Sequence, residues 1–389
     1  MKKLSVADLD VKGLRVLMRV DFNVPMDKET GEITNDLRIR MAMPTVQFAT
    51  ERGARVILMS HLGRPKGKPD QKYSLKKVAD RLGELLGERV AFAPDCVGPQ
   101  AQKAVGALAD GAVLMLENTR FHAEEEENNA EFSGKLAELA DFYVNDAFGT
   151  AHRAHASTVG VAERLPAAAG FLIEKEVQFL SRAITNPDHP YVAVMGGAKV
   201  SDKIAVLKNL LDNVDAMLIG GAMAYTFLKQ QGVSVGASLV EEDRLDVAAE
   251  LLKLGGDRIK LPVDHVCGRE ISADAGIATF DDEIPDGWIG LDIGPRTARQ
   301  YAKEIKAAAL VTWNGPVGYF EIDNFAAGTR AVAQAMADSH ATTIVGGGET
   351  AEAVEQLGLQ DKISHVSTGG GASLEFLAGD KLPGIAILE

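Results

Sequence analysis

The stretch VILMSHLGRP, residues 56–65, combines the two features that decide the fold. Four apolar residues in a row are typical of a strand buried on both faces, as in a parallel sheet covered by helices. The run then continues directly into His61, a glycine and Arg64. Because ligands bind beyond the carboxyl ends of the strands in an open parallel sheet, we expect this strand to carry His61 and Arg64 to a binding site.

Similar apolar runs recur along the chain and alternate with segments of helical periodicity, which is clearest at 74–87 and 325–339. Alternating strands and helices predict parallel sheets built from right-handed βαβ units. The expected strands exceed what one such sheet comfortably holds. We therefore expect an α/β protein with two doubly wound domains and a seam in the helical pattern at 173–190. The expected strands lie at 15–24, 54–62, 112–120, 142–149, 191–197, 216–223, 259–266, 308–315, 342–348 and 363–371.

The formal net charge of -14 argues against general binding to nucleic acid or to an anionic membrane. Residues 1–175 hold 24 Lys and Arg against 25 Asp and Glu, whereas residues 176–389 hold 17 against 30. The first half is therefore the better place to look for an anion site. The four glutamates at 124–127 are expected to form a solvated face.

The two cysteines, Cys96 and Cys267, form no CxxC pair, so neither a disulfide framework nor a structural zinc site is expected. No apolar run has the length of a signal peptide core or of a transmembrane helix. We therefore expect a cytoplasmic protein.

Polar and basic side chains follow the other expected strands of the first half. The planar guanidinium fork of arginine binds carboxylate and phosphate through paired hydrogen bonds. One such arginine would more simply form a surface ion pair, but several at successive strand ends predict an anion site. His152 and His155 lack a third metal ligand, so we expect no metal there. The candidate residues are Asp21 and Asn23 in DFNVP, Arg38 at the start of a helical stretch, Arg120 in ENTRF and Arg153 in DAFGTAHR.

Glycine clusters follow the expected strands of the second half and precede expected helices, in GGAKVSDK (196–203), WNGPVGYFE (313–321), GGGETAEA (346–353) and STGGGAS (367–373). Glycine lets backbone N–H groups approach a phosphate closely. No GxxxxGK[ST] motif occurs, and the GxGxxA match at 346–351 lacks an acid about 20 residues further on. These features favour a nucleotide held by backbone amides, Lys199 and Lys203.

Taken together, the motifs RVDFNVP, SHLGRP, ENTRF, DAFGTAHR, GGAKVSDK, WNGPVGYFE, GGGET and STGGGA resemble those of the phosphoglycerate kinase family, in the family's order and over nearly the whole chain. The resemblance implies phosphoryl transfer between 1,3-bisphosphoglycerate and MgADP, giving 3-phosphoglycerate and MgATP. It also implies a monomer with two Rossmann-like domains at 1–172 and 188–375, a hinge helix at 173–187, and a C-terminal segment, about 376–389, that packs on the first domain.

The resemblance assigns roles residue by residue. It implies that 3-phosphoglycerate is bound by Asp21, Asn23, Arg38, His61, Arg64, Arg120 and Arg153. It implies that the nucleotide is bound by Lys203, Gly315, Glu321, Gly346, Gly347, Gly348, Glu349 and Thr350. The groups implied to act on the transferring phosphoryl are Arg38, Lys199, Gly369 and Gly370, with Gly371 at the following helix start. The family commonly has Asp where this chain has Glu349, so Glu349 is the candidate Mg²⁺ contact.

Two other classes of protein fit parts of this pattern. A dehydrogenase of similar architecture would need a sound dinucleotide fingerprint. A non-catalytic binding protein would not need Arg38, Lys199 and the glycine clusters together. Turnover with ATP and 3-phosphoglycerate distinguishes both from a kinase.

Overall fold

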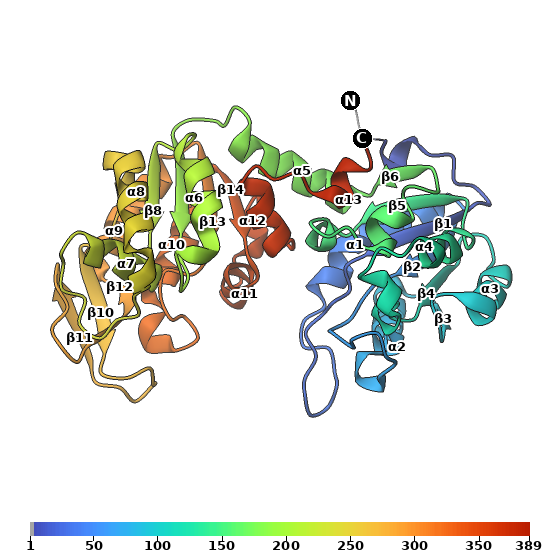
Figure 1. Ribbon diagram of the computed structural model, residues 1–389, viewed down its shortest axis with the longest axis horizontal. Coiled ribbons are helices and arrows are strands. Elements are labelled where there is room, and N and C mark those ends of the chain that lie inside the picture. The colour runs from blue at the N-terminus through green and yellow to red at the C-terminus, as the bar shows by residue number, and fades with distance from the viewer. Residues whose placement is uncertain (1–3) are drawn as a thin grey trace. The chain divides into compact units, whose positions relative to one another are not determined.

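The computed structural model describes residues 4–389, and the chain divides into two compact units. Unit 1 comprises Met1–Val177 and Lys381–Glu389, and unit 2 comprises Gln178–Asp380. Each unit contains a six-stranded sheet in which every pairing of strands is parallel. The expected α/β class with two doubly wound parallel sheets is confirmed (Figure 1).

The sheet of unit 1 has the strand order β3-β4-β2-β1-β5-β6. The chain leaves β1 toward β2 on one side and later returns to β5 on the other. The carboxyl ends of β1 and β5 therefore flank the point where the strand order reverses, which is where open α/β sheets bind ligands. The strands are β1 (Arg15–Val20), β2 (Arg55–Met59), β3 (Ala91–Ala93), β4 (Val113–Leu116), β5 (Phe142–Asp146) and β6 (Ala167–Ala169).

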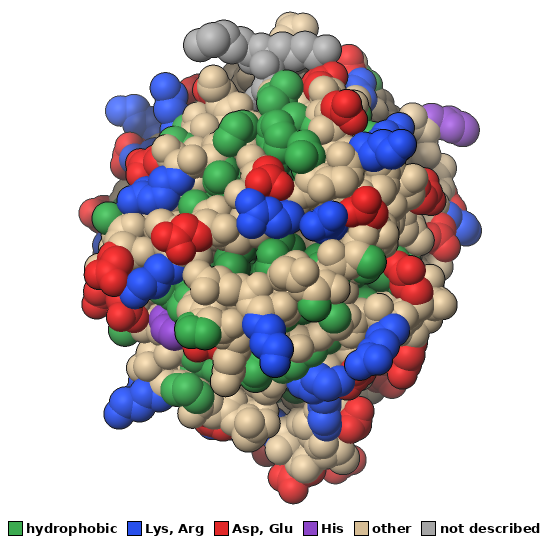
Figure 2. All heavy atoms as spheres, turned by 90° about the vertical axis from the view of Figure 1, so that its right-hand side faces the viewer, with side chains coloured by type: hydrophobic (Ala, Val, Ile, Leu, Met, Phe, Trp, Pro, Cys, Tyr) green, Lys and Arg blue, Asp and Glu red, His purple; other side chains and the backbone are tan. Residues whose placement is uncertain are grey.

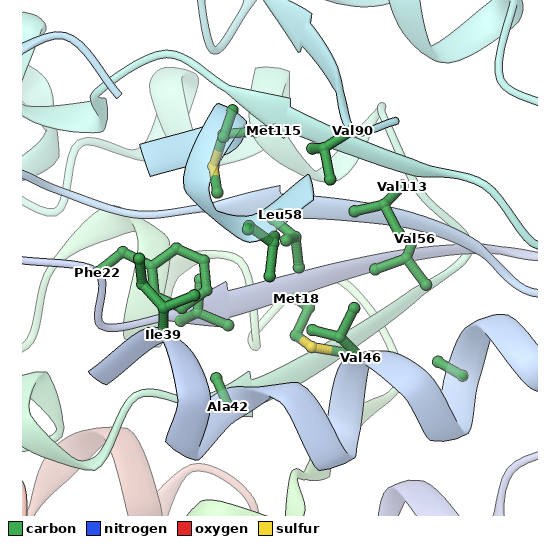
Figure 3. Packing of buried hydrophobic residues seen from close by; sticks show 14 of the residues in the cluster. Met18, Phe22, Ile39, Ala42, Val46, Val56, Leu58, Val90, Val113 and Met115 are labelled. Carbon is green, nitrogen blue, oxygen red and sulfur yellow. The ribbon is translucent and has the colours of Figure 1, made fainter. Parts of the chain in front are cut away.

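The core of unit 1 forms where α1 (Leu37–Glu51) packs on the sheet. Ile39, Ala42 and Val46 recur at helical spacing, so they share one face of α1. Figure 3 shows Val46 beside Met18 of β1, Ile39 beside Phe22, and Ala42 below them on α1. Burial of this face fixes the first turn of α1, which carries Arg38, beside the carboxyl end of β1. The other helices of unit 1 are α2 (Lys76–Leu86), α3 (Gly98–Gly106) and α4 (Ala130–Ala137).

The C-terminal segment belongs to unit 1 from Lys381 onward. Its short helix α13 (Pro383–Ala386) is joined to the loop after β5, because Gly384 N donates to Ala151 O at 2.8 Å. Asn145 Nδ2, from β5, donates to Gly384 O at 2.9 Å. The end of the chain therefore supports the loop that carries Arg153.

The sheet of unit 2 has the order β15-β14-β13-β7-β8-β9, and its strand order reverses between β7 and β13. Its strands are β7 (Tyr191–Met195), β8 (Ala216–Ile219), β9 (Ile259–Lys260), β13 (Leu310–Asn314), β14 (Thr342–Gly346) and β15 (His365–Val366). Its helices are α6 (Ile204–Leu211), α7 (Met223–Gln230), α8 (Leu245–Gly255), α9 (Pro295–Ala307), α10 (Ala327–Ala337), α11 (Gly348–Gln356) and α12 (Gly371–Leu377).

The expected strand at 259–266 is wrong as one element. Residues 259–260 form β9 in the parallel sheet, whereas Asp264–Gly268 form β10 in a separate antiparallel sheet with β11 (Ile277–Asp281) and β12 (Ile289–Ile293). Pro262 lies between them and has no N–H group to donate to a neighbouring strand.

One helix, α5 (Phe171–Ile184), contains the boundary between the units, which falls after Val177. None of the helices formed by residues 4–389 combines the length and the apolarity needed to cross a membrane. Figure 2 shows one face of the molecule, on which acidic and basic side chains are interspersed. That face therefore lacks the continuous basic surface that nucleic acid requires.

Candidate active site

In unit 1, Asp21 lies next to two other expected site residues, Arg38 and His61, at the carboxyl end of β1. Arg38 Nη1 donates to Asp21 Oδ2. His61, which follows β2, has its Nδ1 atom 3.9 Å from Asp21 Oδ1. Burial opposes ionisation of Asp21, but the nearby positive charges, with Arg38 foremost, and the bond from Asn23 N together outweigh it, so the pKa of Asp21 lies below its usual value. Asp21 is therefore an anion that orients the guanidinium of Arg38.

His61 is buried, and burial lowers its pKa well below the usual value. The negative charge of Asp21 raises the pKa, whereas the positive charges of three arginines lower it further: Arg19, Arg120 and Arg38. The imidazole is therefore neutral at neutral pH. Arg19 Nη2 lies 3.1 Å from His61 Nδ1. Because arginine can only donate, Nδ1 is the acceptor and the proton is on Nε2. His61 can therefore offer an N–H donor to a bound anion.

The turn at Gly63 joins two more of the expected residues. Gly63 N donates to Asn23 Oδ1 at 2.8 Å, and Arg120 Nη1 donates to Gly63 O at 3.0 Å. Gly63 has φ 61°, and a Cβ atom there would lie 2.4 Å from the Tyr73 ring, so only glycine fits. This turn holds the loops after β1, β2 and β4 at one edge of the sheet.

Arg153 and Arg64 have looser surroundings. Arg153 Nε donates to His152 Nε2 at 3.1 Å. Burial lowers the pKa of Arg120, and the negative charge of Glu126 opposes this change. The positive charge of Arg153 lowers the pKa of Arg120 further, so Arg153 is close enough to act on Arg120 electrostatically. Arg64 is exposed. The structure thus links Asp21, Asn23, Arg38, His61 and Arg120 by contacts or through Gly63, and it leaves Arg64 open to solvent.

A buried network that sequence reasoning missed supports this cluster. Arg19 lies within β1 and is buried, and its Nε donates to Ser157 Oγ at 2.8 Å. Ser157 in turn donates from its hydroxyl to Glu125 Oε1 and from its backbone N to Glu125 Oε2, the latter at 3.0 Å. The sequence signal was Arg19 itself, a charged residue inside an apolar strand. Such a residue must be paired when it is buried.

Glu125 also corrects an expectation about the four glutamates at 124–127. Glu124, Glu126 and Glu127 are exposed, but Glu125 is fully buried. It ends the single turn η4 (Ala123–Glu125), which directs only this one carboxylate inward. Burial raises the pKa of Glu125, and the charge of Arg19 and the bonds from Ser157 oppose that rise.

In unit 2, Lys203 reaches the switch point between β7 and β13. It ends the turn η7 (Ser201–Lys203), and its Nζ donates to Asn314 O at 3.0 Å and also to Asn314 Oδ1. Burial lowers the pKa of Lys203 to about 8, and the nearby carboxylates Glu349 and Asp202 oppose that shift. Lys203 is thus a buried cation with few compensating anions, which favours binding of an anionic ligand.

Glycines lie around the Lys203–Asn314 pair, at positions where a side chain would collide with neighbouring atoms or crowd Asn314. Gly315 has φ 91°, and a Cβ there would lie 2.3 Å from Gly196 O and 2.8 Å from Lys203 Nζ. Gly315 N donates to Thr350 Oγ1 at 2.7 Å, which ties β13 to the first turn of α11. Gly346 and Gly347 pack near the Asn314 side chain, where a Cβ on either would lie 3.3 Å from Nδ2. The expected Gly315, Gly346, Gly347 and Thr350 are therefore brought together.

The remaining expected residues of unit 2 lie at exposed positions or in the last glycine turn. Lys199, Glu321, Gly348 and Glu349 are exposed. The turn before α12 is ordered by Ser367, whose Oγ accepts from Gly369 N at 3.1 Å, and Gly370 has φ 53°. Among residues 4–389, Glu349 belongs to no group of three closely spaced side chains that could bind a metal ion.

Glu241 is a further residue that sequence reasoning missed. Its Oε2 accepts from Val200 N at 2.6 Å and from Ser201 N at 3.1 Å. Burial opposes ionisation of Glu241, but the Ser201 and Val200 bonds and the charge of Lys199 hold its pKa below the usual value. Glu241 therefore fixes the turn that carries Lys199, and the acidic run Glu241–Asp243 gave no sequence signal of this.

Comparisons with known proteins give one consistent result. A family model described as phosphoglycerate kinase matches residues 6–380. The phosphoglycerate kinase of Solibacter usitatus is 57% identical over 393 residues, covering 100% of both chains. That of Thermosipho africanus is 56% identical over 394 residues, covering 99% of this chain and 98% of the relative. The solved structure of phosphoglycerate kinase from Coxiella burnetii matches with a TM-score of 0.89 and 46% identity, covering 100% of this chain and 99% of that one.

Proposed function

This chain belongs to the phosphoglycerate kinase family, and we propose that it catalyses reversible phosphoryl transfer from 1,3-bisphosphoglycerate to MgADP, giving 3-phosphoglycerate and MgATP. The observation that carries the proposal is the basic cluster at the carboxyl edge of the unit 1 sheet. There Arg38 is oriented by Asp21, His61 by Arg19 and Arg120 by the Gly63 turn. Such a cluster matches the phosphate and carboxylate groups of a phosphoglycerate.

The nucleotide is proposed to bind in unit 2. Lys203 supplies a buried positive charge, and the glycine turns at Gly315 and Gly346–Gly348 let a polyphosphate approach the backbone. The substrate is the Mg²⁺ complex, in which the metal neutralises phosphate charge. Glu349 would supply one carboxylate, and Glu321 would contact the ribose.

The chemistry requires positioning and charge stabilisation rather than a covalent intermediate. The acceptor carboxylate of 3-phosphoglycerate is already ionised, so no general base is needed. Arg38 and Lys199 are proposed to stabilise the equatorial oxygens of the transferring phosphoryl group. The backbone N–H groups at Gly369–Gly371 would add donors to the same oxygens.

The two substrates are assigned to separate units, so transfer requires a state in which they meet. We propose that α5, which crosses the unit boundary, is the hinge. Closure would also exclude water that could otherwise accept the phosphoryl group. Solution scattering tests this, because the radius of gyration should be smallest with both substrates bound. An equal radius with and without substrates would exclude a functional hinge.

The decisive test of function is a coupled assay with ATP and 3-phosphoglycerate. Turnover that requires both substrates supports the proposal, and its absence would favour a non-catalytic binding protein. Reduction of NAD with a small acid would favour a dehydrogenase. We further propose a monomer in a reducing cytoplasm, which agrees with two buried cysteines that form no disulfide. Sedimentation at working concentration tests the oligomeric state.

A further inference from the structure

A cluster of potential metal ligands lies at the edge of the unit 1 sheet, apart from the contacts of the phosphoglycerate site. Asp95 and Cys96 follow β3, and His122 follows the turn η3 (Thr119–Phe121) after β4. Strands β3 and β4 are paired in parallel, with Ala93 opposite Leu116. The two segments therefore leave the sheet side by side, although 26 positions separate Cys96 from His122.

One ligand atom from each of Asp95, Cys96 and His122 lies within 4.8 Å of the others. This is the one group of three or more His, Cys, Asp or Glu side chains with such spacing among residues 4–389. His122 Nε2 lies 2.8 Å from Asp95 Oδ1. Tetrahedral zinc with its usual bond lengths holds its ligands about 3.5 Å apart, so only small side-chain movements would be needed.

The exposure of the three groups suits an ion that enters from solvent. The Cys96 side chain is 0% exposed, whereas the side chains of His122 and Asp95 are 29% and 39% exposed. The latter two can therefore move to admit an ion that then reaches the buried sulfur. Nitrogen, oxygen and thiolate sulfur together are a ligand set that Zn²⁺ prefers.

The electrostatic surroundings also favour a cation. Two further carboxylates, Glu117 and Glu125, are buried in the same region. Both lie close enough to Cys96 to act electrostatically on its side chain. A divalent cation would neutralise these charges and stabilise the thiolate that binds it. The other cysteine, Cys267, is buried but belongs to no such group in the described chain.

We propose that Asp95, Cys96 and His122 form a Zn²⁺ site with three protein ligands and one position for water. A bound ion would link the segments that follow β3 and β4. It would therefore stabilise unit 1 and restrict the turn that carries Arg120, two residues before His122. The proposal does not rest on the phosphoryl transfer proposed above.

The test is a titration of the full, reduced and chelator-treated chain with Co²⁺ as a spectroscopic substitute for Zn²⁺. We expect a near-ultraviolet thiolate-to-cobalt band that saturates at about one equivalent and that Zn²⁺ abolishes. The matched control Cys267→Ser should keep the band, and Cys96→Ser should lose it. His122→Gln, at a partly exposed position, should weaken binding by at least about tenfold.

Thermal unfolding gives a second measurement that does not depend on the buried cysteine variant. At one fixed Zn²⁺ concentration, the ion should raise the melting temperature of the parent and of Cys267→Ser clearly more than that of His122→Gln, because the weaker site is less occupied. Absence of a charge-transfer band in the parent would overturn the proposal. So would a band that survives in Cys96→Ser, or a Zn²⁺-induced shift in His122→Gln as large as that of the parent at the same Zn²⁺ concentration.

Discussion

Lys203 binds Asn314 twice: its ammonium group donates both to the main-chain oxygen of Asn314, at 3.0 Å, and to the side-chain oxygen Oδ1. The remaining donor of Asn314, Nδ2, is buried and has no hydrogen-bond partner in the described chain. It lies next to the Gly346–Gly347 turn. Asn314 therefore orients the lysine and also leaves a donor available to an anionic ligand. We expect that ligand to be the nucleotide phosphates.

This pair predicts that ADP binding takes up protons. Burial lowers the pKa of Lys203 to about 8, so near pH 8 roughly half of these lysines are neutral in the free protein. A bound phosphate anion favours the charged form and raises the pKa again. ADP affinity should therefore fall as the pH rises above about 8. Calorimetry at this pH in buffers of different ionisation enthalpy should show an uptake of about half a proton.

The control for this prediction is Lys203→Arg, because arginine remains charged throughout this pH range. The variant should bind ADP without proton uptake. Equal uptake by the parent and by Lys203→Arg would assign the proton to another group.

Arg38 is predicted to act mainly in the transition state. Its contact with Asp21 holds the guanidinium in place before substrate binds. Arg38→Ala should therefore lower kcat by about 10²–10³-fold and change the KM for 3-phosphoglycerate much less. The exposed Arg64 supplies the comparison, since Arg64→Ala, like Arg153→Ala, should chiefly raise KM. Steady-state kinetics with an unchanged kcat in Arg38→Ala would contradict the assignment.

Lys199 is predicted to be needed for turnover but not for ADP binding. Its side chain is exposed, and its turn is held independently by the bonds from Val200 N and Ser201 N to Glu241. Lys199→Ala should therefore leave that turn intact. Calorimetry should give an ADP Kd within about twofold of the parent, while kcat falls by at least about 10²-fold. If both change by the same factor, Lys199 is an ordinary nucleotide contact.

A buried carboxylate at the start of α5 predicts a pH-dependent stability. Asp146 Oδ1 accepts from Leu172 N at 2.8 Å and from Ile173 N at 3.3 Å. Burial raises the pKa of Asp146 to about 7, against the opposing effect of these bonds. Between its usual pKa of 3.8 and about 7, the folded state binds more protons than the unfolded state. The unfolding free energy should therefore fall as the pH rises through this range.

Asp146→Asn removes the titration and keeps an oxygen that can accept from α5. Its unfolding free energy should fall less than that of the parent between about pH 5 and pH 7, the difference staying below about 4 kcal/mol. Asp292 in unit 2 is the comparison, because burial raises its pKa to about 8. The unfolding free energies of Asp292→Asn and of the parent should diverge over a pH range that extends about one unit higher. Parallel curves for Asp146→Asn and the parent would exclude Asp146 as the source.

The sequence predicted most strands of the two parallel sheets, because each is a continuous apolar run that ends in polar residues. It did not predict the five-residue strands β11 and β12 of the antiparallel sheet. It did not predict β3 and β6, whose three residues, AFA and AAA, are too short to show a pattern. Nor did it predict the pairing of Lys203 with Asn314. That contact depends on the parallel register that places Asn314 opposite Met195, the last residue of β7. Register between distant strands is a tertiary property that no local motif contains.

The candidate site was similarly predictable only in part. Residues in strand-end motifs, such as His61 and Arg120, could be found because the carboxyl edge of a parallel sheet is a general ligand site. Supporting residues such as Glu125 and Glu241 could not be found. Whether a glutamate in a polar loop faces solvent or a buried partner depends on the turn geometry around it. The sequence pattern of four glutamates indicated solvent, and one 3₁₀ turn was enough to bury Glu125.

Glu349 is the last prediction, because this chain has Glu where the family commonly has Asp. It lies in the first turn of α11, is exposed, and is close enough to Lys203 to oppose the lowering of its pKa. Mg²⁺ bound to a nucleotide usually takes phosphate oxygens, waters and one or two carboxylates. Glu349→Ala should therefore raise the Mg²⁺ concentration needed for half-maximal rate at fixed ADP, and Glu349→Asp should keep substantial activity.

The competing explanation is that Glu349 only complements the macrodipole of α11, an effect of roughly 0.3–1 kcal/mol. Because Glu349 raises the pKa of Lys203, the Mg²⁺ titration should be run near pH 6, where Lys203 stays charged even if its pKa falls in Glu349→Ala. A thermal melt of Glu349→Ala supplies the second measurement. A small loss of stability with an unshifted Mg²⁺ midpoint would assign Glu349 to the helix alone. A shifted midpoint with unchanged stability would assign it to the metal–nucleotide complex, since the macrodipole acts without the metal.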